Sequence, residues 1–410
     1  MLIYNQEINN YIFDLEHFDV KYFEGEYFEV FKKFISDKNC YGLYRDDDTW
    51  NVIDKILIKS SITLIPINYT DYESPFHPIL EMDLKILQTM FFTERQANVI
   101  RAHSIHLSTL LFTNDQSELD RSKLPDCYIN SPETLELFFT GKLRGYFNEL
   151  LTCNYNFELG TINTFNLSHA LNNDIKTKLI SGGRYFTSAD TRFHIHPLTK
   201  KILAFKDGLG EGIGNQLSTI LRSNLSFVKK HQGDFNLITS VPAKPESIDR
   251  ISILLNNENL AEFRQFVDCN ILYVNSSYKQ QKDAGDWDSR AANVNGVFSI
   301  KKEISGHVIL VDDIVTSGST AMECVRMLEE AGAEKVTIIA LASMQSRVES
   351  NSELHISCND TSCEGDLKLR FNSRDASPFF GCGKYPECRM TLPFLCGCAK
   401  ISLRERLRTE

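Results

Sequence analysis

The stretch Val308–Thr320 reads V-I-L-V-D-D-I-V-T-S-G-S-T, and it decides how the second half of this chain folds. Its four leading apolar residues are typical of a buried strand in a parallel sheet, which is covered on both faces. Asp312 and Asp313 come next, and we expect them at the carboxyl end of that strand, where open α/β sheets bind ligands. A helical pattern begins after Thr320. The segment therefore predicts a strand, a binding loop and a helix.

The loop carries groups that bind an anion. Backbone N–H groups and hydroxyls can point at one phosphate, and the N-terminus of the following helix adds the positive end of its dipole. The two carboxylates suit the vicinal hydroxyls of a sugar and a divalent cation. An ordinary strand followed by a capped helix would not explain two acids where an unpaired charge is costly. We expect the phosphate to contact Thr316, Ser317, Gly318, Ser319 and Thr320, and the sugar to contact Asp312 and Asp313.

The segment closely resembles the phosphoribosyl-pyrophosphate (PRPP) motif of the type I phosphoribosyltransferases. The resemblance implies that Asp312 and Asp313 contact the ribose hydroxyls, that the loop holds the 5′-phosphate, and that Mg²⁺ binds with PRPP. Enzymes of this kind that act on 6-oxopurines usually carry an aspartate where this chain has Thr316. The departure argues against a hypoxanthine–guanine enzyme and leaves the acceptor unspecified.

Two further segments are predicted to hold pyrophosphate. Ser240–Pro245, S-V-P-A-K-P, follows a predicted strand and offers the charge of Lys244, although a plain proline-rich turn would look the same. Ser276–Phe298 is long and polar, as lids often are. Its end, R-A-A-N-V-N-G-V-F, resembles the ComF branch of the family. By that analogy the hood over pyrophosphate contains Lys279, Lys282 and Arg290, the alternative being a mobile charged surface loop.

Two cysteine pairs near the C-terminus, separated by a hairpin-like stretch, predict a tetrahedral zinc site with four thiolates. They are Cys358, Cys363, Cys382 and Cys388. The surrounding sequence resembles the zinc ribbons at the C-terminus of type IA topoisomerases. The first pair is spaced more widely than usual, so Cys396 and Cys398 are alternative ligands, and reduced structural cysteines are the other interpretation. With neither histidine nor carboxylate in the set, the zinc should be structural.

Topoisomerase ribbons bind single-stranded DNA through aromatic and basic residues. The aromatic candidates here are Phe371, Phe379, Phe380 and Tyr385. They could stack on bases or could simply form the small core of the ribbon. The last ten residues, I-S-L-R-E-R-L-R-T-E, are predicted to form a solvated helix.

The first 190 residues carry no motif that we can assign firmly. Ile62–Ile67 and Leu107–Phe112 are predicted strands, and Met82–Ala102 is a predicted helix. The end of Leu107–Asp115 is weakly similar to the second motif of haloacid-dehalogenase-type phosphatases, but their nucleophile motif is not visible upstream. A structural or ligand-sensing α/β domain is the favoured interpretation.

Length and net charge limit the number of domains and the classes of partner that this chain can have. A chain of 410 residues should hold two or three domains. A net charge of −10 argues against coating nucleic acid through overall charge. Neither a signal peptide nor an apolar run of about 18 residues is visible, so we expect a cytoplasmic protein without a membrane partner.

The predicted fold class is α/β, with a type I phosphoribosyltransferase parallel sheet flanked by helices, an N-terminal α/β domain and a small C-terminal zinc ribbon. The predicted units are residues 1–190, 195–345 and 355–398, followed by a charged tail, 399–410. The favoured hypothesis is a magnesium-dependent phosphoribosyltransferase linked to nucleic-acid metabolism. The alternative is a non-catalytic PRPP or nucleotide sensor, which docks on single-stranded DNA or a partner enzyme through the ribbon.

Overall fold

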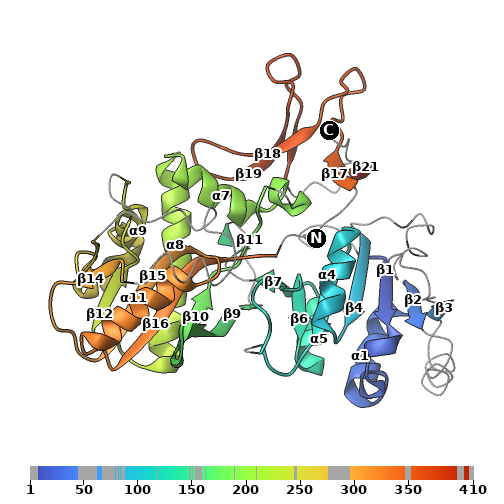
Figure 1. Cartoon of the computed structure of the whole chain (residues 1–410). Coiled ribbons are helices and arrows are strands. Elements are labelled where there is room, and N and C mark those ends of the chain that lie inside the picture. The colour runs from blue at the N-terminus through green and yellow to red at the C-terminus, as the bar shows by residue number, and fades with distance from the viewer. Residues whose placement is uncertain are drawn as a thin grey trace.

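The computed structural model shows two sheets side by side and a small β unit next to α7 (Figure 1). It describes residues 8–44, 62–66, 88–116, 118–146, 159–161, 163–188, 190–208, 210–243, 247–275, 296–346, 352–394 and 401–405, with a few isolated residues between them. None of the helices in these ranges is long and apolar enough to cross a membrane.

The first sheet has six strands, and every neighbouring pair is parallel. In spatial order they are β3 (Ile62–Pro66), β2 (Asn39–Tyr44), β1 (Asn10–Asp14), β4 (Thr89–Thr93), β5 (Ser108–Phe112) and β6 (Cys127–Ile129). The helices of this unit include α1 (Gly25–Ile35), α4 (Gln96–Ser104) and α5 (Pro132–Phe139). The strand order reverses between β1 and β4, as in doubly wound α/β folds.

The strands predicted near β3 and β5 are confirmed, whereas the helix predicted over Met82–Ala102 is confirmed only at its end, Gln96–Ala102, which lies in α4. Its middle forms β4, all five residues of which are buried in the sheet. A short run that is apolar on both faces has no helical or strand period of its own, so its neighbours decide its structure.

The second sheet contains β12 (Leu237–Ser240), β15 (His307–Val315), β16 (Lys335–Met344), β10 (Asn172–Ser181) and β9 (Asn163–His169), with β11 (Arg184–Tyr185) also paired to β16. All of its pairs are parallel except the edge pair of β9 and β10. Around it lie α7 (Pro197–Lys206), α8 (Glu211–Gln232), α9 (Arg250–Leu255) and α11 (Ser319–Glu330), together with the 3₁₀ turns Thr191–His194 and Glu258–Phe266. Strands β9 to β11 precede residue 190, so the predicted division near residues 190–195 does not coincide with the edge of this sheet.

Strand β15 explains why its sequence is apolar at every position. Val308 and Leu310 belong to the core cluster that includes α11, whereas Ile309 and Val311 belong to the cluster that includes α8. Both faces of the strand are therefore covered by helices, as a parallel sheet requires. The first of these clusters also includes Leu111 and Tyr128 of the first unit, so it continues from one sheet to the other.

The C-terminal unit has a three-stranded antiparallel sheet of β18 (Leu367–Phe371), β19 (Pro378–Cys382) and β20 (Thr391–Pro393). Beside it, β17 (Ser352–Ile356) pairs with β21 (Ile401–Glu405), so the helix predicted for the tail is wrong at these residues. The other two-stranded pairs are β13 (Leu272–Val274) with β14 (Phe298–Ile300) and β7 (Leu143–Tyr146) with β8 (Leu159–Thr161). The turn after β18 contacts α8, because Gln216 Nε2 donates to the Asp375 carbonyl at 3.3 Å.

Candidate functional site

The acid pair lies where β15 extends beyond its neighbour. β15 continues to Val315, four residues further than the predicted strand, and pairs with β16 as far as Ser343. On its other side β12 pairs with β15 only as far as Val311. Asp312 and Asp313 therefore lie on β15 just beyond the point where its pairing with β12 ends, at the carboxyl edge of the sheet. There they help to line a cavity of about 520 Å³.

This cavity brings together four segments that are separated in the sequence. The residues that line it are Tyr185, Lys206, Val241, Pro242, Ala243, Ser247, Ile248, Asp249, Arg250, Ile251, Asp312, Asp313, Ile314, Val315, Thr316, Gly318, Thr320 and Ala321. Its volume lies within the usual range for small-molecule sites. The predicted acid pair and part of the predicted phosphate loop thus share one cavity.

The two carboxylates have different surroundings. Asp313 Oδ2 forms an ion pair with Lys206 Nζ at 2.6 Å, and the Asp313 N–H donates to Asp312 Oδ1 at 2.8 Å. Burial raises the pKa of Asp312 to about 7, and the neighbouring Asp313 carboxylate adds to that rise. The Asp312 carboxyl is therefore partly protonated at neutral pH in the free protein, while Asp313 has a cationic partner.

Lys206 and Tyr185 are site residues that the sequence did not indicate. Lys206 is the last residue of α7, and Tyr185 ends the two-residue strand β11. Burial raises the pKa of Tyr185, and the Asp313 carboxylate raises it further, so the phenol remains a hydrogen-bond donor. Neither residue belongs to a local motif, because only the pairing of β11 with β16 and the packing of α7 against β11 bring them to the cavity.

The predicted phosphate loop folds as a tight turn into α11. Gly318 adopts φ +89°, which is strained for any residue with a Cβ, and its carbonyl accepts from the Met322 N–H at 2.8 Å. Thr316, Gly318 and Thr320 line the cavity. Ser317 and Ser319 are buried instead, and their hydroxyl oxygens lie 2.9 Å apart. The five loop residues therefore divide between the cavity and the support behind it.

The predicted pyrophosphate groups lie outside the residues that the structure describes. They are Lys244, Lys279, Lys282 and Arg290. On either side of Lys244, however, Pro242, Ala243 and Ser247 line the cavity next to the acid pair.

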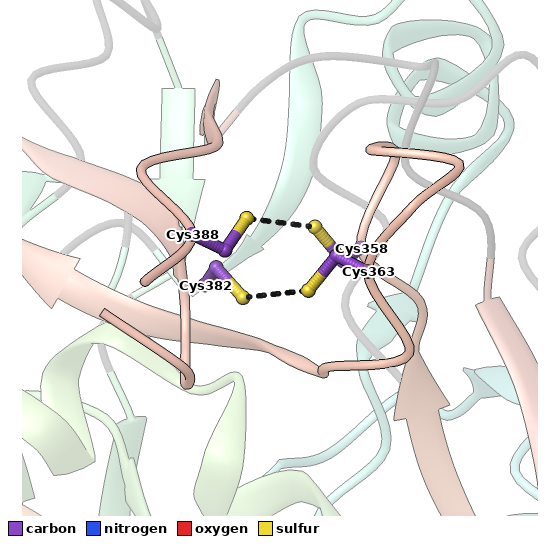
Figure 2. A group of neighbouring side chains, drawn as sticks. All are labelled: Cys358, Cys363, Cys382 and Cys388. Atoms are coloured by element: carbon purple, nitrogen blue, oxygen red, sulfur yellow. Dashed lines mark hydrogen bonds between the residues drawn. The ribbon is translucent and has the colours of Figure 1, made fainter. Parts of the chain in front are cut away.

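The four predicted metal ligands converge on one point (Figure 2). Their sulfur atoms all lie within 4.8 Å of one another, with Cys358 and Cys388 3.7 Å apart and Cys363 and Cys382 also 3.7 Å apart. Four sulfurs bound to zinc at about 2.3 Å would be roughly 3.8 Å apart, so the cluster fits a tetrahedral metal ion. The alternative ligands Cys396 and Cys398 lie outside the described residues.

Backbone N–H groups contact two of the four sulfur atoms of this cluster. The Lys384 N–H donates to Cys382 Sγ at 3.4 Å, and this backbone hydrogen bond lowers the pKa of Cys382. The Gly365 N–H donates to Cys363 Sγ at 3.3 Å. Because a metal binds thiolates rather than thiols, these donors favour the ligand form.

The aromatic residues of the ribbon differ in their exposure. Phe380 is buried in the small core of this unit, and Phe371 packs under Lys201 Nζ, which lies 5.2 Å from its ring centroid. Tyr385 is 63% exposed, and its neighbours Lys384 and Arg389 are also exposed. Of the proposed stacking residues, Phe380 therefore serves the core and Tyr385 is accessible.

Comparison with known proteins supports the fold class predicted for the second sheet. Residues 247–366 match the family model described as the phosphoribosyl transferase domain, and that span contains β15, the acid pair, the loop and α11. No curated protein matches the chain. The match and the parallel sheet both support a domain of the phosphoribosyltransferase type and phosphoribosyl transfer as the general class of chemistry.

Proposed function

We propose that the protein is a magnesium-dependent phosphoribosyltransferase that binds PRPP in the cavity at the end of β15. The observation that carries the proposal is the meeting of Asp312 and Asp313 with Thr316, Gly318 and Thr320 of the loop in one cavity. A phosphate on the loop would leave the attached ribose next to the carboxylates. The acceptor stays open, as the residues that choose it in this family vary.

The chemistry requires positioning more than a strong base. The loop N–H groups and hydroxyls would hold the 5′-phosphate, and Asp312 and Asp313 would accept hydrogen bonds from the ribose hydroxyls. The carboxylates would also help to hold Mg²⁺, whose charge would stabilise the departing pyrophosphate. We assign pyrophosphate contacts to Lys244, Lys279, Lys282 and Arg290. A closed hood would exclude water from the oxocarbenium-like transition state.

Binding would also require a change of charge in the acid pair. Asp312 must lose the proton that its raised pKa of about 7 retains in the free protein. Lys206 already neutralises Asp313, so the incoming cation would compete with this lysine for the carboxylate. Because Asp312 must lose this proton, we expect binding to strengthen as the pH rises through neutrality.

A non-catalytic PRPP or nucleotide sensor is the second candidate. The exposed ring of Tyr385, with the exposed Lys384 and Arg389 close to it in the sequence, suits stacking on single-stranded DNA or docking on a partner enzyme. In both candidates we propose zinc as the structural metal of the four cysteines, a cytoplasmic location and a role in nucleic-acid metabolism, as the ComF-like resemblance implies.

The binding proposal is tested by the double substitution Asp312→Asn and Asp313→Asn. We expect calorimetry to show loss of Mg-PRPP binding, by at least about tenfold, because two charge-assisted contacts disappear. Asp268→Asn is the matched control, since Asp268 is an acid outside the cavity that pairs with Lys302. Unchanged affinity in a folded double variant would remove the site assignment.

Turnover separates the enzyme from the sensor. Pyrophosphate release from Mg-PRPP should be measured with a panel of candidate bases, with and without single-stranded DNA. Release that depends on an acceptor and disappears in the double variant supports the enzyme. PRPP binding without release under any of these conditions supports the sensor.

A further inference from the structure

A buried arginine of the first unit contacts the back of the phosphate loop. Arg121, in the segment between β5 and β6, is 8% exposed. Its Nη1 donates to the Thr316 carbonyl at 2.6 Å and its Nη2 to the Ser317 carbonyl at 2.7 Å. A Cβ added at Gly318 would lie 3.7 Å from the same Nη2. The guanidinium therefore lies directly against the loop, and Arg121 is not among the residues that line the cavity.

The position of Arg121 is fixed from two sides. Gln345, just after β16, donates from Nε2 to the Arg121 carbonyl at 2.9 Å, and its Oε1 accepts from the Leu124 N–H at 3.0 Å. Gln96, at the start of α4, donates to the carbonyls of Asp120 and Lys123, both at 2.9 Å. The segment that carries Arg121 is thus attached both to the first unit and to the second sheet.

No carboxylate in the described part of the chain forms an ion pair with the Arg121 guanidinium, although the charge of the nearby Asp120 acts on it. The nearby Asp120 is already engaged, because it accepts from Ser122 and forms an ion pair with Lys123 at 2.9 Å. A buried guanidinium that is met only by carbonyl oxygens keeps its full positive charge, and burial is costly unless an anion approaches. The loop between Arg121 and the cavity is where we propose that a phosphate binds.

The two hydrogen bonds also orient the loop amides. In a trans peptide the C=O and the N–H point in opposite directions. Holding the carbonyls of Thr316 and Ser317 toward Arg121 therefore turns the N–H groups of Ser317 and Gly318 away from it. Thr316 and Gly318 line the cavity, whereas Arg121 does not.

We propose that Arg121 is a positioning residue which sets the phosphate-binding conformation of the loop, so that the first unit is an integral part of the ribose-phosphate site. The inference rests on the proposed function for the identity of the ligand, a ribose 5-phosphate group. It assigns to the first unit a role in the site, and it predicts that movement between the two sheets changes phosphate affinity.

The test compares two ligands in calorimetry with Mg²⁺: ribose 5-phosphate, which needs the loop, and pyrophosphate, which does not. We expect Arg121→Ala to weaken ribose 5-phosphate binding at least tenfold and pyrophosphate binding less than twofold. Arg121→Lys, which keeps the charge but loses the two-pronged donor, should fall between wild type and Arg121→Ala. Ser346→Ala is the matched control and should behave as wild type, because Ser346 holds the same segment through Ser122 without touching the loop.

Equal loss of both ligands in both Arg121 variants would show general damage and overturn the inference, as would unchanged ribose 5-phosphate binding. Crystal structures of these variants give a readout that needs no ligand. Displaced carbonyls at Thr316 and Ser317 support the inference, and an unmoved loop overturns it. If wild type binds neither ligand, the proposed function fails, and the loop conformation alone then decides the role of Arg121.

Discussion

Asp312 and Asp313 are adjacent in sequence and chemically alike, yet their surroundings give them different roles. Asp313 faces Lys206 at the end of α7, whereas Asp312 has its charged form disfavoured by burial and by its neighbour. Two adjacent carboxylates of this kind repel each other, and a bound cation and ribose hydroxyls would reduce that repulsion. The free protein should therefore be less stable than it would be without the Asp312 charge.

Asp312→Asn should change stability in a pH-dependent way. The pKa of Asp312 is about 7 in the folded protein against a reference of 3.8, so the folded state holds the proton more tightly. That contribution to stability is fully present below about pH 4 and is lost as the pH rises through about 7. In urea unfolding without ligand, the free energy of unfolding of the variant relative to that of wild type should therefore increase by roughly 1–3 kcal/mol from pH 5 to pH 8. Asp268→Asn should show no such trend, and parallel curves for Asp312→Asn and wild type would contradict the raised pKa.

At the scale of elements, the cysteine cluster connects strands that have little core of their own. Cys358 follows β17, Cys382 ends β19, and Cys388 precedes β20. Small β units of this kind usually depend on a structural metal. The ribbon also contacts the second sheet's helices, through Phe371 under Lys201 and through Asp375 on Gln216.

Cys363→Ser should abolish metal binding and open the ribbon. We expect zinc content, measured by elemental analysis, to fall from about one ion per chain toward zero, because three thiolates hold a structural zinc poorly. Limited proteolysis should then cut between β17 and β20, while the two large sheets remain protected. Cys269→Ser is the control, since Cys269 lies outside the cluster. Full zinc content in Cys363→Ser would mean that another residue completes the ligand set.

At the scale of the whole molecule, buried charges join the two units. Arg184 of β11 donates from Nε to Glu149 Oε1 at 3.0 Å and from Nη1 to Asp126 Oδ1, next to β6, at 2.8 Å. His196 Nε2 lies 3.1 Å from Glu149 Oε2. Burial alone would raise the pKa of Glu149, but Arg184 and His196 outweigh burial and lower it. Such a network fixes the geometry between the units, because removing one member leaves the others buried and uncompensated.

Glu149→Ala should destabilise the protein by about 3–5 kcal/mol in urea unfolding, because Arg184 and His196 would lose their shared carboxylate in the interior. The pKa of Glu149 is lower in the folded protein than its unfolded value of 4.5, so the Glu149 carboxylate stabilises the fold at pH values above 4.5. Acidification removes this contribution. The difference from wild type should therefore narrow below about pH 4. Glu262→Ala, at an exposed pair with Arg222, should cost less than about 1 kcal/mol. Equal effects of the two substitutions would contradict the role of burial.

Elements that local signals determine were predicted from the sequence, whereas elements that depend on distant segments were not. The strand at Val308–Val311 and the helix that begins after Thr320 were predicted because apolar period and capping are local signals, and both are confirmed within a few residues. The helix predicted over Met82–Ala102 failed in its middle, where β4 lies, because a central strand has no period. The tail failed because β21 exists only through pairing with β17.

The sequence by itself determined the chemistry of this protein: an acid pair before a small-residue loop, and four cysteines that fit one metal ion. Both are short-range patterns whose function depends on residue type and spacing. Only the tertiary structure decided what surrounds them. Lys206 on Asp313, Arg121 behind the loop and β9 to β11 in the second sheet result from packing between distant segments. Such contacts produce no periodic pattern in the sequence, because each depends on how distant segments pack in the folded core.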